Sequence, residues 1–498
     1  MKADATNAVL VAGNLYAEDL SGGCQNDKAR GVNLCPVKAT AAKDDFDWVL
    51  PERARQSSTF SEPASEPRAQ AFVSKISEPE PGPSAPATPH HHVQLAPQLA
   101  VRQLPTLARN PRFRRSCFFE ATLRAGATDW SLYNHMLLPC RYDWYDNPIE
   151  EYEHLKSHVC IWDVAAERQV ELVGPDSVTL IEMLTPRPMG DMKVGQCRYA
   201  IITDDEGMVL NDPVVSRIGE DKFWLSGADG DLILWAKGLA VGRGLHVKVT
   251  EASVSPVAVQ GPKSTALIAD LLGDDWIYDL KYFNFRQIEL DGMPIACARS
   301  GWSPEVGYEL YLQDESRGNE LWDRLMEAGK RYNLRPGSPN LMRRIEGGML
   351  NFGSDITPDH SILELGLPPS WIGAPDKCKK VDFIDKEALQ RAHQEGGAKR
   401  RVVGIELCDK EACRALESVW DITVASQSQG DFGAVGKVTS IALSPSLDSW
   451  IGIATLANDV AEPGTNVCVN TPDGVRRAIV KKLPFLPREQ LLPRPKVA

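Results

Sequence analysis

The sequence predicts an α+β protein whose globular part follows a long N-terminal extension. Of its 498 residues, 43% are apolar and 24% are charged, which is the composition of an ordinary soluble chain. Segments with helical periodicity lie among segments with strand-like alternation, without the regular strand–helix–strand order of a parallel sheet. No run of about 18 apolar residues occurs, so we expect no membrane-spanning helix.

Charge and cysteine content narrow the class of partner. The 55 Lys and Arg against 67 Asp and Glu give a net charge of −12, which disfavours binding to nucleic acid or to an anionic membrane. The 11 cysteines form no C-x-x-C pair and no zinc-ligand spacing, so we expect free thiols and no metal. A cytoplasmic location is expected; we read no clear targeting signal, and a mitochondrial location is left open.

Residues 1–110 differ in composition from the rest of the chain. Repeated Ser-Glu-Pro steps and the run PGPSAPATPHHH leave few periodic apolar residues to offset the entropy of ordering. We therefore expect a disordered Pro- and Ser-rich extension. No chemistry is assigned to it, and its three adjacent histidines are interpreted as low-complexity sequence.

The expected elements follow from periodicity, with Pro and Gly marking their ends. A proline begins the first helix, an Asp-Glu-Gly turn joins the hairpin, and a Gly-Pro break separates a strand from the next helix. In chain order they are a helix over 147–159, a strand over 168–173, a helix over 175–184, a hairpin over 199–218, a strand over 223–225, a helix over 232–242, a strand and helix over 254–273, strands over 294–312, helices over 320–332 and 340–349, and mostly short strands from about residue 382.

Two segments resemble a metal-binding and a phosphate-binding motif, but each lacks the neighbouring residues or elements that such a site requires. His154 and His158 have zinc-ligand spacing on one helix face, but the glutamate of a metalloprotease motif is absent between them. Gly436-Lys437 resembles the end of a phosphate-binding loop, yet Val438 follows and no helix begins there. Both are interpreted as structural features.

Three segments combine tight-turn glycines with carboxylates and aromatic side chains. Asp212 follows an apolar strand, and Arg344 lies in a short helix that ends in glycines. Between these segments, Trp302, Glu309 and Tyr311 cluster around two glycines, with Glu309 and Tyr311 on one strand face. The same residues are equally typical of core aromatics beside an edge charge.

These segments resemble the folate-dependent aminomethyltransferase family, whose type member is the T-protein of the glycine cleavage system. The resemblance runs in order from about residue 128 to 487 and includes the strings IWDVAAERQVELVGPDS, GQCRYAIITDDEGMVLNDPVV, ARSGWSPEVGYELYL, RRIEGGMLNFGSDI and GKVTSIALSPSL. Within the family it is closest to the branch that demethylates dimethylsulfoniopropionate. The T-protein has Ser-His where this chain has Ala165-Ala166, and a pair of acids where it has Asn211-Asp212.

The resemblance implies an architecture of three subdomains around a folate cavity. Two interleaved α+β subdomains would form the catalytic region over 111–375, and a β-barrel or jelly roll would follow over 376–490. A homodimer is left open.

The resemblance also implies the chemistry: transfer of a methyl group from the sulfonium of dimethylsulfoniopropionate to tetrahydrofolate, the methyl-accepting cosubstrate. Trp302 would supply an aromatic platform for the sulfonium, with Tyr311 completing the wall and offering its hydroxyl to the substrate carboxylate. Glu309 would accept the paired donors of the pterin ring. Asp212 would orient the substrate and stabilise positive charge.

Four residues are secondary candidates within the same resemblance. Tyr133 would contact the methyl donor, while Tyr199 and Gln260 would contact the folate. Arg344 would hold the folate tail or, equally, form a helix–helix ion pair with an unidentified partner.

Three alternatives remain open at this stage. The chain could be an enzyme of the same family acting on another N- or S-methyl donor, a non-catalytic folate-binding assembly factor, or a scaffold that binds partners through its proline-rich arm. Retention of Glu309 and Asp212 argues against the assembly factor.

Overall fold

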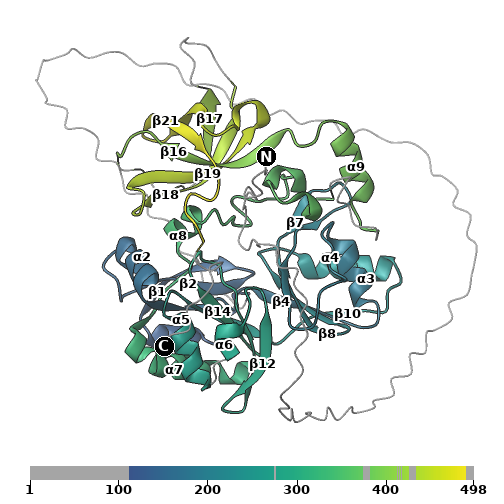
Figure 1. Ribbon diagram of the computed structural model, residues 1–498, viewed down its shortest axis with the longest axis vertical. Helices are drawn as coiled ribbons and strands as arrows, with labels where there is room; N and C mark the ends of the chain where they lie inside the picture. Colours follow the sequence, from purple (N-terminus) through teal and green to yellow (C-terminus); the bar gives the residue numbers. More distant parts are fainter. Residues whose placement is uncertain are drawn as a thin grey trace, which may run out of the picture. The chain divides into compact units, whose positions relative to one another are not determined.

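The computed structural model describes residues 112–488, with breaks at 274–275, 374–381, 412, 414–415, 417 and 425–432 (Figure 1). The predicted extension over 1–110 lies outside the described residues. Within the described ranges, no helix is long and apolar enough to cross a membrane.

Short helices connect and flank the strands. They are α1 Phe119–Arg124, α2 Pro148–Ser157, α3 Ser177–Leu184, α4 Leu232–Gly242, α5 Ser264–Leu272, α6 Trp276–Asp279, α7 Gly318–Gly329, α8 Leu341–Glu346 and α9 Lys386–Gln394.

The strands preceding the last part of the chain are β1 Ala127–Tyr133, β2 Met136–Tyr142, β3 Val159–Asp163, β4 Arg168–Val173, β5 Cys197–Tyr199, β6 Ile202–Thr203, β7 Val209–Asn211, β8 Val214–Gly219, β9 Lys222–Gly227, β10 Lys248–Glu251, β11 Ser255–Gln260, β12 Phe285–Leu290, β13 Met293–Ala298, β14 Gly307–Leu312 and β15 Leu334–Pro336. The strands that follow are β16 Arg400–Leu407, β17 Trp420–Val424, β18 Gly436–Ser444, β19 Ser449–Ala457, β20 Asn466–Thr471 and β21 Gly474–Lys481.

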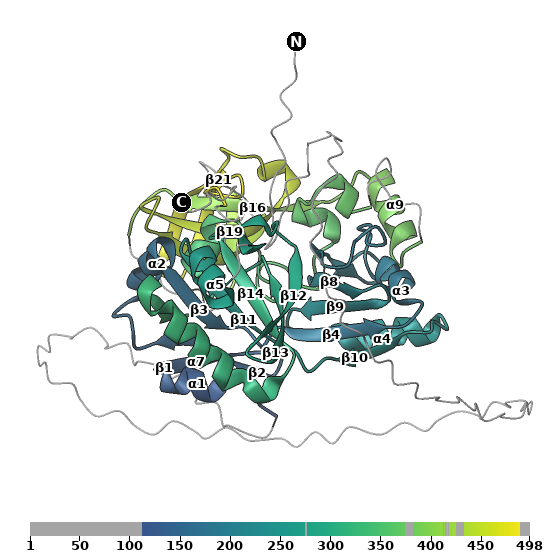
Figure 2. The same cartoon turned by 60° about the horizontal axis from the view of Figure 1, so that its bottom comes forward.

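Two sheets make up the larger part of the fold, and each has helices on one face. The five-stranded sheet has the order β10-β4-β9-β8-β5, and α3 and α4 pack their leucines on its valines and phenylalanine. The six-stranded sheet has the order β12-β13-β14-β11-β3-β15, and α5 and α7 cover it in the same way (Figure 2). Alternation along each strand sends apolar side chains to these helices and other side chains to the opposite face.

The helix-free faces of the two sheets meet each other. Trp224 of β9 and Tyr311 of β14 have ring centroids 6.4 Å apart, and the hydroxyls of Ser226 and Tyr311 lie 3.3 Å apart. Residues of both sheets share one buried cluster with α8 and the segment after it. The space between the sheets is therefore the interior of the larger part of the fold.

The last six strands form a closed barrel in the order β16-β19-β18-β17-β20-β21. Helix α8 connects this barrel to the sheets. Arg344 of α8 pairs with Asp355, and its Nη2 donates to Ser440 Oγ of β18 at 2.6 Å. Asp355 in turn accepts from Thr439 at 2.7 Å and from Ser440 at 2.6 Å, so the arginine, the aspartate and β18 form one buried polar cluster.

The α+β prediction with a C-terminal β-barrel is confirmed. The predicted strand 168–173 and helix 232–242 coincide with β4 and α4. The predicted hairpin 199–218 is present: Tyr199 of β5 pairs with Val214 of β8, and Ile202 of β6 pairs with Asn211 of β7. Strands β5 and β8 also belong to the five-stranded sheet. Helix α9 was not predicted because only Ala388 and Leu389 of its residues are buried apolar side chains.

The buried pair of Arg344 and Asp355 generates a stability prediction. Asp355→Asn removes the anion and leaves the guanidinium buried, so we expect the free energy of unfolding to fall by about 3 kcal/mol. The matched control is Asp323→Asn, which breaks the exposed pair of Arg124 and Asp323 and should change stability by less than about 1 kcal/mol. Urea denaturation measures both, and equal effects of the two variants would contradict the prediction.

Candidate functional site

A cavity of about 330 Å³ lies between the two sheets. Its wall takes side chains from the β1–β2 hairpin, the turn after β3, the ends of β7 and β9, β14 and the segment after α8. Five of the predicted site residues line it: Tyr133, Tyr199, Asp212, Trp302 and Glu309. A volume of this size suits a small-molecule site with a few polar groups.

Glu309 lies in the middle of β14, with its carboxylate at the cavity wall. Its Oε2 accepts hydrogen bonds from Ser300 Oγ and from Tyr311 Oη, the latter at 3.1 Å. Burial raises the pKa of Glu309, and the two hydrogen bonds oppose that rise. The structure thus places Tyr311 behind Glu309, where it is bonded to the carboxylate and is not part of the cavity wall.

Asp212 follows β7, which ends at Asn211. The Asn211 side chain bonds both the N–H and the C=O of Ala228, at 3.0 and 3.1 Å, and so attaches this strand end to the end of β9. Tyr199 Oη donates to Asp212 Oδ2 at 3.0 Å. Burial nevertheless raises the pKa of Asp212 to about 7, so this carboxyl is poised between its two protonation states at neutral pH.

Tyr133 reaches the cavity from the β1–β2 hairpin. Asn134 and His135 at the turn have positive φ, a conformation that asparagine tolerates better than most residues. The buried Asn134 side chain donates to the carbonyls of Ala166 and Gly227 at 3.0 and 3.1 Å. These bonds hold the hairpin against the two larger sheets and carry Tyr133 to the wall.

Trp302 lies in the loop between β13 and β14, and Gln260 fills the space beneath that loop. Gln260 Nε2 donates to Ser300 O at 3.2 Å, and its Oε1 accepts from Ser303 Oγ at 2.8 Å. A Cβ at Gly307 would lie 2.2 Å from the Gln260 amide, so glycine is required there. Gln260 is therefore placed under the cavity wall and fixes both sides of the tryptophan.

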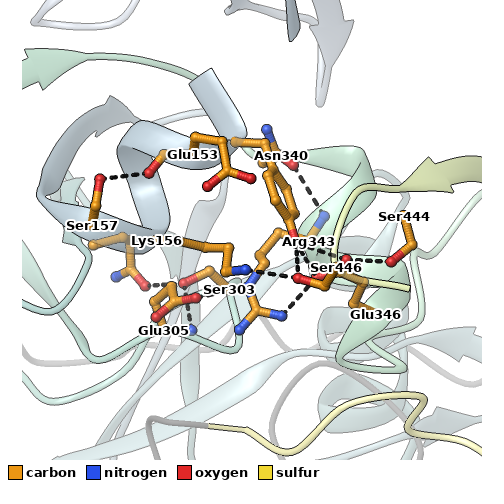
Figure 3. Close-up of polar contacts among 12 residues, drawn as sticks. Glu153, Lys156, Ser157, Ser303, Glu305, Asn340, Arg343, Glu346, Ser444 and Ser446 are labelled. Atoms are coloured by element: carbon orange, nitrogen blue, oxygen red, sulfur yellow. Dashed lines mark hydrogen bonds and ion pairs between the residues drawn. The ribbon is translucent and has the colours of Figure 1, made fainter. Parts of the chain in front are cut away.

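The same loop is held from the other side by α8. Figure 3 shows Arg343 between two carboxylates: its Nε donates to Glu305 Oε1 at 2.7 Å, and its Nη1 to Glu346 Oε2 at 2.8 Å. Glu346 Oε1 also accepts from Tyr152 at 2.8 Å and from Ser444 of β18 at 2.6 Å. The loop is thus connected through α8 to α2 and to the barrel.

Arg344 does not line the cavity. Its guanidinium carbon lies 5.6 Å from the centre of the Trp302 ring, and its charge is matched by Asp355. The structure shows an ion pair for Arg344, as one of its two predicted roles required, but the partner Asp355 lies in a turn and not in a second helix.

One lining residue with obvious chemistry, Glu167, was missed from the sequence. It lies in the turn between β3 and β4, and no spacing rule distinguishes it from the polar residues of any exposed turn. The only available signal was the unusual stretch Ala165-Ala166-Glu167 inside a segment that otherwise matched the family. Within the described ranges, no group of three or more His, Cys, Asp and Glu side chains has an arrangement that could hold a metal ion.

The fold and the cavity correspond to a known family. The model of the GCVT N-terminal domain matches residues 118–371, and the model of the glycine cleavage T-protein C-terminal barrel domain matches residues 400–486. The chain belongs to the aminomethyltransferase family of the glycine cleavage T-protein. It is therefore a folate-dependent enzyme of the methyltransferase type.

Individual relatives agree with this assignment. Dimethylsulfoniopropionate demethylase DmdA of Ruegeria pomeroyi is 36% identical over 374 residues, which cover 74% of this chain and 97% of that protein. An aminomethyltransferase of Bacillus mycoides is 27% identical over 349 residues, covering 68% and 90%. Among solved structures, aminomethyltransferase T of the Bartonella henselae glycine cleavage system shares the fold, with a TM-score of 0.66 at 22% identity over 76% of this chain and 99% of that one.

The buried Asp212 generates a prediction about pH. Its pKa is about 7 in the folded protein against an ordinary 3.8, so the native state binds more protons than the unfolded chain between these values. Stability conferred by protonation is then lost as the pH rises toward 7 and stays lost above it. We expect Asp212→Asn to be more stable than the wild type, with a larger advantage at about pH 8 than at about pH 5.5.

Urea denaturation of both proteins at both pH values checks this expectation. A stability difference that does not change with pH would show that the carboxyl is ionised throughout this range.

Proposed function

We propose that this protein transfers a methyl group from dimethylsulfoniopropionate to N5 of tetrahydrofolate, with methylmercaptopropionate and 5-methyltetrahydrofolate as products. The observation that carries the proposal is that one cavity is lined by an aromatic face, Trp302, and by two acidic side chains, Glu309 and Asp212. The similarity to the demethylase of Ruegeria pomeroyi supports the choice of donor.

Glu309 fits the folate side of this reaction. Tetrahydrofolate, when bound, supplies the nucleophilic nitrogen that accepts the methyl group. Both described donors to Glu309, Ser300 and Tyr311, bond to Oε2, so Oε1 has no described donor and is available to the paired N–H groups of a pterin ring. In this proposal Tyr311 is a positioning residue that fixes the plane of the Glu309 carboxylate.

Trp302 and Tyr133 fit the donor side. The indole face attracts an onium cation by about 0.5 to 2 kcal/mol, depending on how far water is excluded. Burial and nearby carboxylates raise the pKa of Tyr133 well above its ordinary value, so its hydroxyl stays protonated and can donate to the donor's carboxylate. Gln260 and Arg343 act through the Trp302 loop, which they hold in place, whereas Arg344 joins α8 to the barrel.

The transfer itself demands little acid–base catalysis. The positive sulfur already activates its methyl group, so the protein aligns sulfur, methyl and N5 and excludes water. The S–CH₃ bond breaks as the N5–CH₃ bond forms, and the proton that N5 then carries in excess is released. Asp212, held by Tyr199, stabilises the positive charge as it moves from sulfur to N5.

The direct test is incubation of the full chain with tetrahydrofolate and a panel of methyl donors. The panel contains dimethylsulfoniopropionate, sarcosine and dimethylglycine, and chromatography measures methylated folate and demethylated donor together. We expect stoichiometric product from the sulfonium. Product from an amine alone would replace the donor in this proposal, and folate binding without turnover of any donor would indicate an assembly factor.

Two substitutions separate the two halves of the site. Trp302→Leu keeps apolar bulk but removes the π face, so we expect the KM for the sulfonium to rise about tenfold with little change for tetrahydrofolate. Glu309→Gln removes charge-assisted acceptance, so we expect tetrahydrofolate binding to weaken by about 2 kcal/mol with little change for the sulfonium. Steady-state kinetics with each substrate varied in turn provides the measurement.

Each variant serves as the control for the other, because both lie in the same cavity. If both changes raised only the sulfonium KM, Glu309 would not bind folate. If Trp302→Leu left the sulfonium KM unchanged, the donor would bind elsewhere in the cavity.

A further inference from the structure

The cavity wall carries acidic side chains and no basic ones. Three carboxylates line it, those of Glu167, Asp212 and Glu309, whereas none of the lining residues is lysine, arginine or histidine. A cavity with this lining favours a ligand that presents a positive charge. Asp212 and Glu309 already have roles in the proposed reaction, and Glu167 has none.

The backbone turn between β3 and β4 fixes the position of Glu167. Its N–H donates to Val164 O at 3.0 Å, and its C=O accepts from Gln169 Nε2 at 2.8 Å. The adjacent cation, Arg168, is turned away and donates from Nε to Glu251 at 3.0 Å. The cation adjacent to Glu167 in the sequence therefore pairs with a different carboxylate.

Glu167 differs from its two acidic neighbours in its contacts. Asp212 accepts from Tyr199, and Glu309 accepts from Ser300 and Tyr311, whereas no described side chain or N–H donates to the Glu167 carboxylate. The groups that face it are the carboxyls of Asp212 and Glu309 and the phenols of Tyr133 and Tyr311. The half-buried Glu167 carboxylate at the cavity wall therefore has its hydrogen-bonding and charge-pairing capacity available to a ligand.

We propose that Glu167 is a specificity-determining residue that faces the positive charge of an onium methyl donor. The inference rests on the proposed function for the identity of the donor. A sulfonium or quaternary ammonium centre carries methyl groups and no N–H or O–H, so it pairs with a carboxylate by charge and not by a directed hydrogen bond. A carboxylate that has no donors of its own, in the same wall as the Trp302 ring, matches that requirement.

Protonation of the Glu167 carboxyl should oppose binding of the cation. Burial, Glu309 and Asp212 all raise the pKa of Glu167, and a bound cation acts in the opposite direction. Binding of an onium ion therefore shifts Glu167 toward its ionised form, and the affinity for the cation should fall as the pH is lowered.

The test uses binding without turnover, so that it does not depend on methyl transfer. Isothermal titration in the absence of folate compares dimethylsulfoniopropionate with 4-methylpentanoate, the isostere that has a neutral carbon in place of the sulfonium and keeps the carboxylate. Trimethylsulfonium is added as a cation without a carboxylate. We expect the wild type to prefer the sulfonium over the isostere by about tenfold or more, and Glu167→Gln to lose most of that preference. Glu167→Asp should keep part of it.

Two controls keep the result specific. Glu153→Gln removes the same charge from the exposed face of α2 and should leave the preference unchanged, and tetrahydrofolate should bind Glu167→Gln as it binds the wild type. A Glu167→Gln protein that retains the full preference, or a wild type that binds no onium ion, overturns the inference. Charge-selective binding without methyl transfer would refute the proposed function and still support the role of Glu167.

Discussion

The burial of acidic side chains between two facing sheets is the constraint on which the site depends. A carboxylate removed from water needs hydrogen bonds or a counter-charge, and around this cavity such groups come mainly from hydroxyls. Tyr199 donates a hydrogen bond to Asp212, while Ser300 and Tyr311 donate hydrogen bonds to Glu309. Neutral donors keep these carboxyls in place without supplying a counter-charge, so a cationic ligand can pair with a carboxyl that is ionised.

The walls of the cavity come from distant parts of the chain, and each part is attached by polar groups of its own. Asn134 attaches the first hairpin to two sheets, and Asn211 joins β7 to the end of β9. Gln260 holds the Trp302 loop from below. These amide side chains bond to backbone groups, so the wall's geometry depends on hydrogen bonds as much as on apolar packing.

The sequence predicted individual helices and strands better than it predicted which distant segments come together. The bounds of strand β4 and helix α4 were predicted correctly, because each is a short segment that contains several apolar residues and is flanked by polar residues or glycine. The hairpin over 199–218 was also predicted correctly, because its two arms pair with each other around one turn. The pairing of β8 with β9 in the five-stranded sheet was not predicted, because it depends on a strand outside the hairpin. Trp302, Glu309 and Asp212 were found through the family's motifs, whereas periodicity alone left them indistinguishable from core residues. Glu167 was missed because its environment is created only when the sheets come together.

The two adjacent arginines of α8 connect the barrel to the cavity wall. Arg343 reaches the loop that carries the tryptophan, while Arg344 reaches β18 through Ser440. A helix of six residues thus engages the cavity wall and the barrel at once. In evolutionary terms, the barrel is not a module that can be exchanged freely among relatives. A foreign barrel would need a hydroxyl opposite Arg344 and another opposite Glu346, or α8 would lose its contacts with the barrel although every residue of the cavity was unchanged.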